Sequence, residues 1–210
     1  MPLRLALVIA SSAAVVASMG DLLLLWVAAA TQPALGLPSP PPSALIVGHF
    51  AGVLAIPLYG LGWVALARPM AIAQPRAAGL VRAAGVYGSA LGAAIHGTTA
   101  AVLAAERGMA GVTIDAMAMV GRWAMLLLPL WALASVLIAA ASFLWGRAAL
   151  DDQAGVPRWT AWTNPVIGTL AIAVLGGATP LGRALLVPAA PNLACVVFFV
   201  VVAARLRTER

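Results

Sequence analysis

The chain has 210 residues, of which 63% are hydrophobic and 9% are charged, and its formal net charge is +6. Soluble domains carry about 25% charged residues, so this composition excludes a water-soluble globule and predicts an integral membrane protein. All basic residues are arginines placed between apolar runs, which excludes the concentrated basic face of a nucleic-acid-binding protein. The single cysteine, Cys195, excludes an internal disulfide and a cysteine-pair metal site.

Six apolar segments are long enough to cross a bilayer as helices, which takes about 20 residues each. They comprise residues 5–30, 44–67, 83–105, 114–145, 159–178 and 184–204. We therefore predict an all-α membrane protein, with residues 1–210 forming a single domain built as a bundle of six transmembrane helices.

The first segment runs unbroken from Leu5 to Ala30, which is too long for the apolar part of a cleaved signal peptide, so we expect a retained helix. The linker TQPALGLPSPPPS follows, and its five prolines favour an extended loop. Pro57 lies in the middle of the second segment and predicts a kink, because its ring clashes with the preceding turn.

The third segment follows a loop that is expected to hold Arg68, Arg76 and Arg82. The fourth is longer than a perpendicular crossing requires, so we expect it to tilt, to kink at Pro129 or to project from the bilayer.

The fifth segment opens with WTAWTNP, where the two tryptophans fit an interfacial aromatic belt. Asn164 is expected to cap that helix, since Pro165 suits an early helical position. The sixth segment contains Pro188 and Pro191, and a helix loosened by proline can line a cavity.

Six crossings put both termini on the same side of the membrane. Nine arginines fall on that side and three on the other. Because arginine-rich loops stay in the cytoplasm, we predict cytoplasmic termini, an external proline-rich linker and a location in the bacterial inner membrane.

Polar residues on five of the six segments fall at a similar depth in the outer half of this topology, at a rise of 1.5 Å per residue. They are Asp21, His49, His96, Arg122 and Asn192. Titratable groups at such a depth need a partner or a water-filled cavity. We therefore predict that these side chains line a small polar pocket, with Tyr59 and Tyr87 as neighbours.

Our main hypothesis for this pocket is the binding or handling of a small or lipophilic molecule. The binding side chains would be His49, Tyr59, Arg122 and Asn192. The expected partners are the lipid bilayer and this small-molecule or lipid ligand; the sequence predicts no nucleic acid, and it specifies neither a cofactor nor an oligomeric state.

A first alternative is an intramembrane enzyme that acts on a lipid-type substrate and uses Asp21, His49 and His96, with His96 and Asp21 as the catalytic residues. A histidine would be the acid–base group, and Asp21 or Arg122 would stabilise charge. Two imidazoles and a carboxylate, from His49, His96 and Asp21, would also suit zinc or iron, although no H-E-x-x-H spacing is present. A second alternative is a small transporter, with a proton relay through Asp21 and His96. The remaining alternative is a purely structural role, in which Asp21 pairs with Arg122 and the histidines bond to threonine, tyrosine or backbone groups.

Small residues recur at a spacing of four in Gly48-x-x-x-Gly52 and Gly88-x-x-x-Gly92. Such spacing lets two membrane helices approach closely. We interpret both motifs as helix-packing faces.

Several short motifs are spread over nearly the whole chain. They are Gly20-Asp21, Gly52 through Pro57-Leu58-Tyr59-x-x-Gly62, Gly88-x-x-x-Gly92-x-x-x-His96-Gly97, Asn164-Pro165, and Pro188-x-x-Pro191-Asn192-Leu193 leading into Phe198-Phe199. Together they resemble a broad family of uncharacterised bacterial six-helix integral membrane proteins, a domain of unknown function. The resemblance implies fold and topology and no particular reaction.

Overall fold

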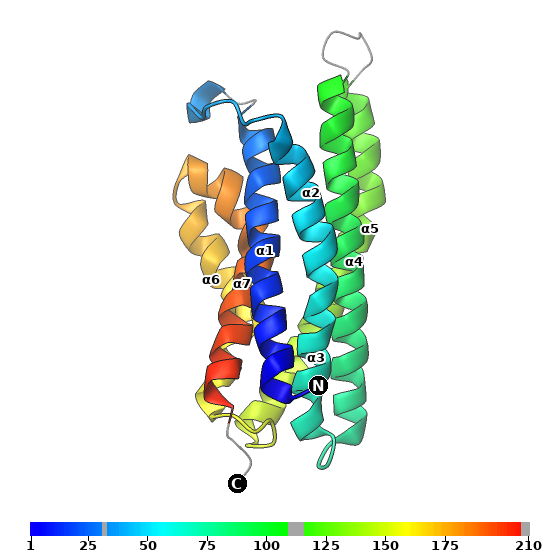
Figure 1. Ribbon diagram of the computed structural model, residues 1–210, viewed down its shortest axis with the longest axis vertical. Coiled ribbons are helices and arrows are strands. Elements are labelled where there is room, and N and C mark those ends of the chain that lie inside the picture. The colour runs from blue at the N-terminus through cyan, green and yellow to red at the C-terminus, as the bar shows by residue number, and fades with distance from the viewer. Residues whose placement is uncertain (31–32, 109–115, 207–210) are drawn as a thin grey trace.

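The computed structural model describes residues 1–30, 33–108 and 116–206 (Figure 1). Its α-helices are α1 (Leu3–Ala29), α2 (Ser43–Ala55), α3 (Tyr59–Met70), α4 (Pro75–Gly108), α5 (Ala116–Leu150), α6 (Pro165–Gly177) and α7 (Pro180–Arg205). Three 3-10 segments are η1 (Pro33–Leu35), η2 (Ile56–Leu58) and η3 (Arg158–Thr163). No strand occurs within the described ranges.

Among the described residues, five helices are long and apolar enough to cross a membrane, counting α2, η2 and α3 as the single span Ser43–Met70. This confirms an all-helical chain with the character of a multi-pass membrane protein. The sixth predicted crossing is shorter: α6 has 13 residues and spans about 20 Å, against a hydrocarbon core of about 30 Å. The count of six crossings therefore stays a prediction.

The span from Ser43 to Met70 changes its helical geometry at Pro57, where the sequence predicts a kink. Residues Ile56–Leu58 form a 3-10 turn. Proline supplies no backbone N–H and its ring clashes with the preceding turn, so the α-helical hydrogen-bond pattern is interrupted there. Helix α3 then begins at Tyr59 and brings its side chain into the bundle.

Helices α4 and α5 extend beyond the predicted apolar segments. Helix α4 begins at Pro75 and has 34 residues, so Arg76 and Arg82 lie on the helix and not in the predicted loop. Helix α5 has 35 residues and continues to Leu150. Arginine favours helix formation and its long side chain can reach an interfacial layer, so the helical backbone continues where hydropathy falls.

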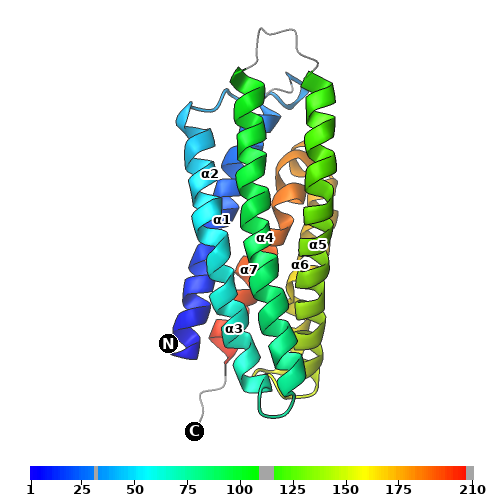
Figure 2. The ribbon, with the colours of Figure 1, turned by 90° about the vertical axis from the view of Figure 1, so that its right-hand side faces the viewer.

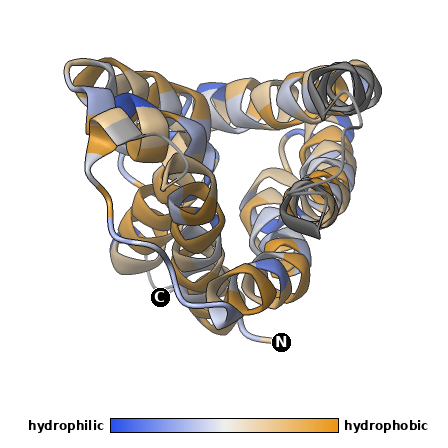
Figure 3. Cartoon of the chain, turned by 90° about the horizontal axis from the view of Figure 1, so that it is seen from above, coloured by the Kyte–Doolittle hydropathy of each residue, from blue (hydrophilic) through white to orange (hydrophobic). Residues whose placement is uncertain are grey.

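The helices form an elongated bundle in which α1 packs on α2, α3 and α7 (Figures 1 and 2). Helix α4 packs along α5, and α6 along α7. Seen from above, apolar residues cover the outward faces of helices as well as the faces that meet (Figure 3). This distribution fits an apolar surrounding medium, because a soluble bundle keeps its outward faces polar.

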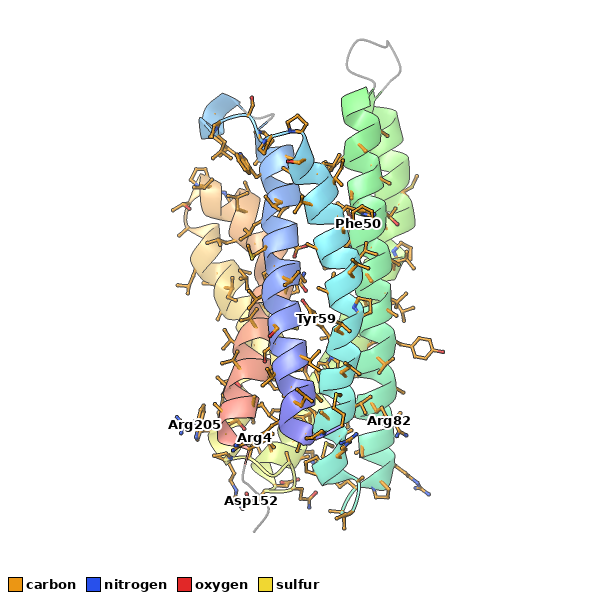
Figure 4. The ribbon with its side chains drawn as sticks, viewed as in Figure 1. Arg4, Phe50, Tyr59, Arg82, Asp152 and Arg205 are labelled. Carbon is orange, nitrogen blue, oxygen red and sulfur yellow. The ribbon has the colours of Figure 1, made fainter. Side chains whose placement is uncertain are left out.

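The first and last described turns lie at the same end of the bundle (Figure 1). Arg4 donates a 3.4 Å hydrogen bond to the carbonyl of Leu206, and Arg68 donates one of 2.8 Å to the carbonyl of Met1. Arg82 and Arg205 lie toward the same end (Figure 4). The arginine-rich end predicted from the sequence is therefore also the end of both termini.

An aromatic cluster holds the helices together toward this end. Trp63, Trp145, Phe198 and Phe199 are fully buried. The ring of Phe198 packs edge-on against Trp145, with centroids 4.8 Å apart, and lies 5.7 Å from Trp63. Gly85 gives Trp63 its space on α4, because an added Cβ there would overlap the indole ring.

Candidate functional site

A chain of hydrogen bonds connects four polar side chains and one backbone carbonyl on α3, α7, α1, α4 and α2. Oδ1 of Asp21 lies 3.0 Å from Nδ1 of His96, and Oδ2 accepts a 2.6 Å hydrogen bond from Nδ2 of Asn192. Oδ1 of Asn192 accepts a 2.8 Å hydrogen bond from the hydroxyl of Tyr59. Nε2 of His96 lies 2.9 Å from the carbonyl oxygen of Gly48. We call these five residues the Asp21 network.

The contact with Gly48 determines the tautomer of His96. A carbonyl oxygen only accepts, so Nε2 of His96 carries a proton and donates it. The contact between Nδ1 and Oδ1 of Asp21 then needs one further proton. That proton lies either on Nδ1, giving an imidazolium and a carboxylate, or on Oδ1, giving two neutral groups. In both arrangements the pair has no net charge.

The Asp21 network lies within apolar parts of the spans. Asp21 is about 12 Å from the C-terminal end of α1, at 1.5 Å per residue, and Tyr59 lies in the middle part of the bundle (Figure 4). The side chain of His96 is 5% exposed and that of Asp21 is 18% exposed. Asp21 is therefore the member of the pair that retains an accessible side.

Glycines bring α1, α2 and α4 close enough to make these contacts. An added Cβ on Gly20 would lie 2.9 Å from the carbonyl oxygen of Gly48, and one on Gly52 would overlap the ring of His96. Backbones that approach this closely tolerate no side chain at the crossing. The packing face predicted from Gly48 and Gly52 thus contains the acceptor of His96 and the space for its ring.

Two other predicted residues, His49 and Tyr87, lie outside the Asp21 network. His49 lies beside Gly97, and its buried Nδ1 has no hydrogen-bond partner in the described part of the chain. Tyr87 is 69% exposed on α4. The side chain of Arg122 falls outside the described residues, so its expected pairing with Asp21 stays a prediction.

The described residues contain no group of three histidine, cysteine, aspartate or glutamate side chains that could hold a metal ion. Both ring nitrogens of His96 already have partners. In this arrangement the ring could ligate a metal only after losing one of them.

The predicted cap at Asn164 is confirmed. Its Oδ1 accepts hydrogen bonds from the backbone N–H groups of Val166 and Ile167, at 3.1 and 3.3 Å. Its amide donates to the carbonyl of Ala161. The side chain thereby fixes the junction between η3 and α6. This structural role uses both Oδ1 and Nδ2 of Asn164.

The sequence did not predict that the carbonyl of Gly48 is the acceptor of His96. Gly48 was interpreted only as a packing residue, although its position next to His49 was a usable signal. A glycine in a close helix crossing exposes its carbonyl to the facing helix, so a polar residue at the same depth on that helix is a candidate donor. His96 is that residue.

Comparison with known proteins gives one match. The family of unknown function DUF6796 matches residues 3–209. Neither the curated proteins nor the solved structures contain a match. Since the family match extends over nearly the whole chain, the protein belongs to this family of unknown function, DUF6796.

Proposed function

We propose that this chain is a multi-pass inner-membrane protein that binds a small or lipophilic molecule in the outer half of its bundle. Asp21 and His96 exchange a proton with that molecule, and Tyr59 and Asn192 contribute to its binding. The observation that carries this proposal is the contact between Nδ1 of His96 and Oδ1 of Asp21, 3.0 Å apart inside apolar spans, which requires one proton between the two atoms.

The shared proton explains how the pair can be buried without a third charged group. Isolated ionised side chains are costly within a bilayer, and such groups are usually paired and face the interior. The pair remains neutral as a whole wherever the proton lies. A molecule that takes or supplies a proton would leave a net charge on the pair, and its own opposite charge would compensate for it.

Asp21 is the group through which the exchange is proposed to occur. Its side chain is more exposed than that of His96, whose Nε2 is occupied by the carbonyl of Gly48. Asn192 holds the second carboxylate oxygen and is itself held by Tyr59. His96 would therefore be the buried partner that exchanges a proton with Asp21, and Asn192 would orient the carboxylate.

A purely structural function is the second candidate, and the completeness of the Asp21 network favours it. Both carboxylate oxygens of Asp21 and both ring nitrogens of His96 have partners. Satisfied polar networks fix the relative positions of helices. An experiment must therefore separate binding from stability.

The test compares wild-type protein with Asp21→Asn and His96→Gln after purification in a mild detergent. Tyr87→Phe is the matched control, since Tyr87 is exposed and outside the network. Copurified small molecules are extracted with solvent and measured by mass spectrometry, and folding is checked by thermal melting. We expect one enriched molecule, near one per chain in wild type and control, that is lost from both variants while they stay folded.

Two results would contradict the proposal. One is a molecule retained equally by wild type and Asp21→Asn. The other is the absence of any enriched molecule in the wild type together with large stability losses in both variants, which would assign the network a structural role.

A further inference from the structure

A second site lies at the end of the bundle that carries the termini, away from the Asp21 network. A pocket of about 390 Å³ lies between the last turns of α5, the η3 segment and the start of α6. We propose that this pocket binds the headgroup of a zwitterionic phospholipid that carries a phosphate and a primary ammonium group, with the lipid taken from the surrounding leaflet.

Two opposite charges, one on the last turn of α5 and one directly after its end, provide the recognition. Arg147 and Asp151 both line the pocket and lie one helical turn apart. Nε of Arg147 is 3.8 Å from Oδ2 of Asp151, which is too long for a hydrogen bond. The guanidinium therefore keeps donors for a phosphate, and the carboxylate keeps acceptors for an ammonium. A headgroup with these two charges on a two-carbon linker matches the pair.

Aromatic side chains on two elements provide the apolar wall. Phe143 on α5 and Trp162 on η3 line the pocket and are 68% and 65% exposed. Tryptophan concentrates where the hydrocarbon core meets the headgroups. A lipid placed with its headgroup at Arg147 and Asp151 would run its glycerol and first acyl carbons along these two rings.

Ser142 is a buried polar residue in the wall of the pocket. It lines the pocket, is 1% exposed, and its Oγ has no hydrogen-bond partner among the described residues. Buried serines elsewhere in the bundle donate to the carbonyl four residues earlier, as Ser11 and Ser89 do at 2.7 Å. A buried unpaired hydroxyl is unfavourable. Because Oγ has almost no accessible surface, an ester or phosphate oxygen would accept its hydrogen bond only after the pocket wall opens.

Gly146 keeps the space open. It lines the pocket between Ser142 and Leu150, and an added Cβ would meet no neighbouring atom closer than 3.9 Å. A Cβ at position 146 therefore fits without a clash, and a larger side chain there would fill the pocket. Gly146→Leu is accordingly a variant that blocks the pocket without removing a charge.

The test uses delipidated protein and native mass spectrometry with an equimolar mixture of phosphatidylethanolamine, phosphatidylcholine and phosphatidylglycerol of identical acyl chains. We expect wild type to retain phosphatidylethanolamine roughly fivefold more than either other lipid, because one charge-assisted contact is worth about that ratio or more. Phosphatidylcholine has no ammonium proton for Asp151, and phosphatidylglycerol has no cation.

The variants test the contribution of each charge on its own. Arg147→Gln should reduce retention of phosphatidylethanolamine to the level of nonspecific binding, Asp151→Asn should abolish its preference over phosphatidylcholine, and Gly146→Leu should abolish the preference altogether. Arg82→Gln is the matched control, an exposed arginine at the same end of the bundle. Equal retention of all three lipids by wild type, or an unchanged preference in folded Arg147→Gln, would overturn the proposal.

Discussion

The imidazole ring of His96 occupies the volume that a side chain at Gly52 would need. The same ring donates to the carbonyl of Gly48, one helical turn earlier on α2. Helices α2 and α4 therefore pack together through one histidine and two glycines. The same packing places Nδ1 of His96 beside the carboxylate of Asp21.

Replacement of Gly52 by alanine should destabilise the protein. The new methyl group overlaps the ring of His96, so the ring or α2 must move. Overpacking of this kind costs about 1–3 kcal/mol, and the free energy of unfolding can be measured by titration with SDS from mild-detergent micelles. Gly79→Ala is the control, since an added Cβ there meets nothing within 4 Å. Equal stability of Gly52→Ala and wild type would show that the crossing is looser than described.

The coupling between Asp21 and His96 should be measurable in a double-mutant cycle. Asp21→Ala and His96→Ala each leave a partner without its hydrogen bond, so the loss in the double variant should be smaller than the sum of the single losses. Membrane-embedded hydrogen bonds couple by about 0.6 kcal/mol on average and up to about 1.7 kcal/mol. We expect a value in the upper part of this range, because the pair shares a proton. A coupling energy of zero would exclude a direct bond.

Tyr59→Phe should remove one hydrogen bond and leave the packing intact. The hydroxyl donates to Asn192, while the ring packs against Phe199 with centroids 6.0 Å apart. We expect a loss of about 1 kcal/mol in the free energy of unfolding, the usual worth of such a bond. Tyr87→Phe changes the same chemical group at an exposed position and should have no effect. A loss of similar size in both variants would refute the assignment.

The tautomer of His96 can be observed by nitrogen NMR of isotope-labelled histidine. The chain has two histidines, so His49→Gln leaves a single set of ring signals. We expect Nε2 to be protonated, since it faces the carbonyl of Gly48. In Asp21→Ala, Nδ1 loses its partner and its signal should move more than that of Nε2. A signal showing Nε2 without a proton would contradict the arrangement.

The orientation in the membrane can be tested with single cysteines and a reagent that does not cross the bilayer. The native Cys195 is buried and should react little. We expect Ser39→Cys, in the proline-rich linker, to be labelled in intact cells. Gln74→Cys, in the turn before α4, should react only after permeabilisation. The opposite pattern would place the termini outside.

The limits of the apolar segments could be predicted because hydropathy alone defines them. The ends of α4 could not, since Arg76 and Arg82 extend a helix beyond the apolar run and composition does not distinguish helix from loop there. The start of the fifth segment differs for another reason. Trp159 and Trp162 were assigned to a helix, but they lie in η3 because Asn164 caps α6 only after them.

Depth along the helices brought the right kinds of residue to one level, but it carries no information on rotation about the helix axis. Asp21, His96 and Asn192 face one another, whereas Tyr87 points away from the bundle. His49 follows Gly48 directly, and the 100° turn between neighbours on a helix places the carbonyl in the network and the imidazole beside Gly97. Only the close approach of the helices at the glycines determines whether the carbonyl of Gly48 or the imidazole of His49 joins the Asp21 network.

The short α6 has a consequence for the lipids around the protein. A helix of 13 residues spans about 20 Å, which is about 10 Å less than the thickness of the hydrocarbon core. The turn after it is stabilised by Thr179, which caps α7, and by Arg183, which donates to the carbonyl of Gly177. A guanidinium at that depth draws headgroups and water toward itself. On the α6 side, the bilayer should therefore be thinned into a dimple, and the protein should be favoured in membranes that are thin or easily deformed.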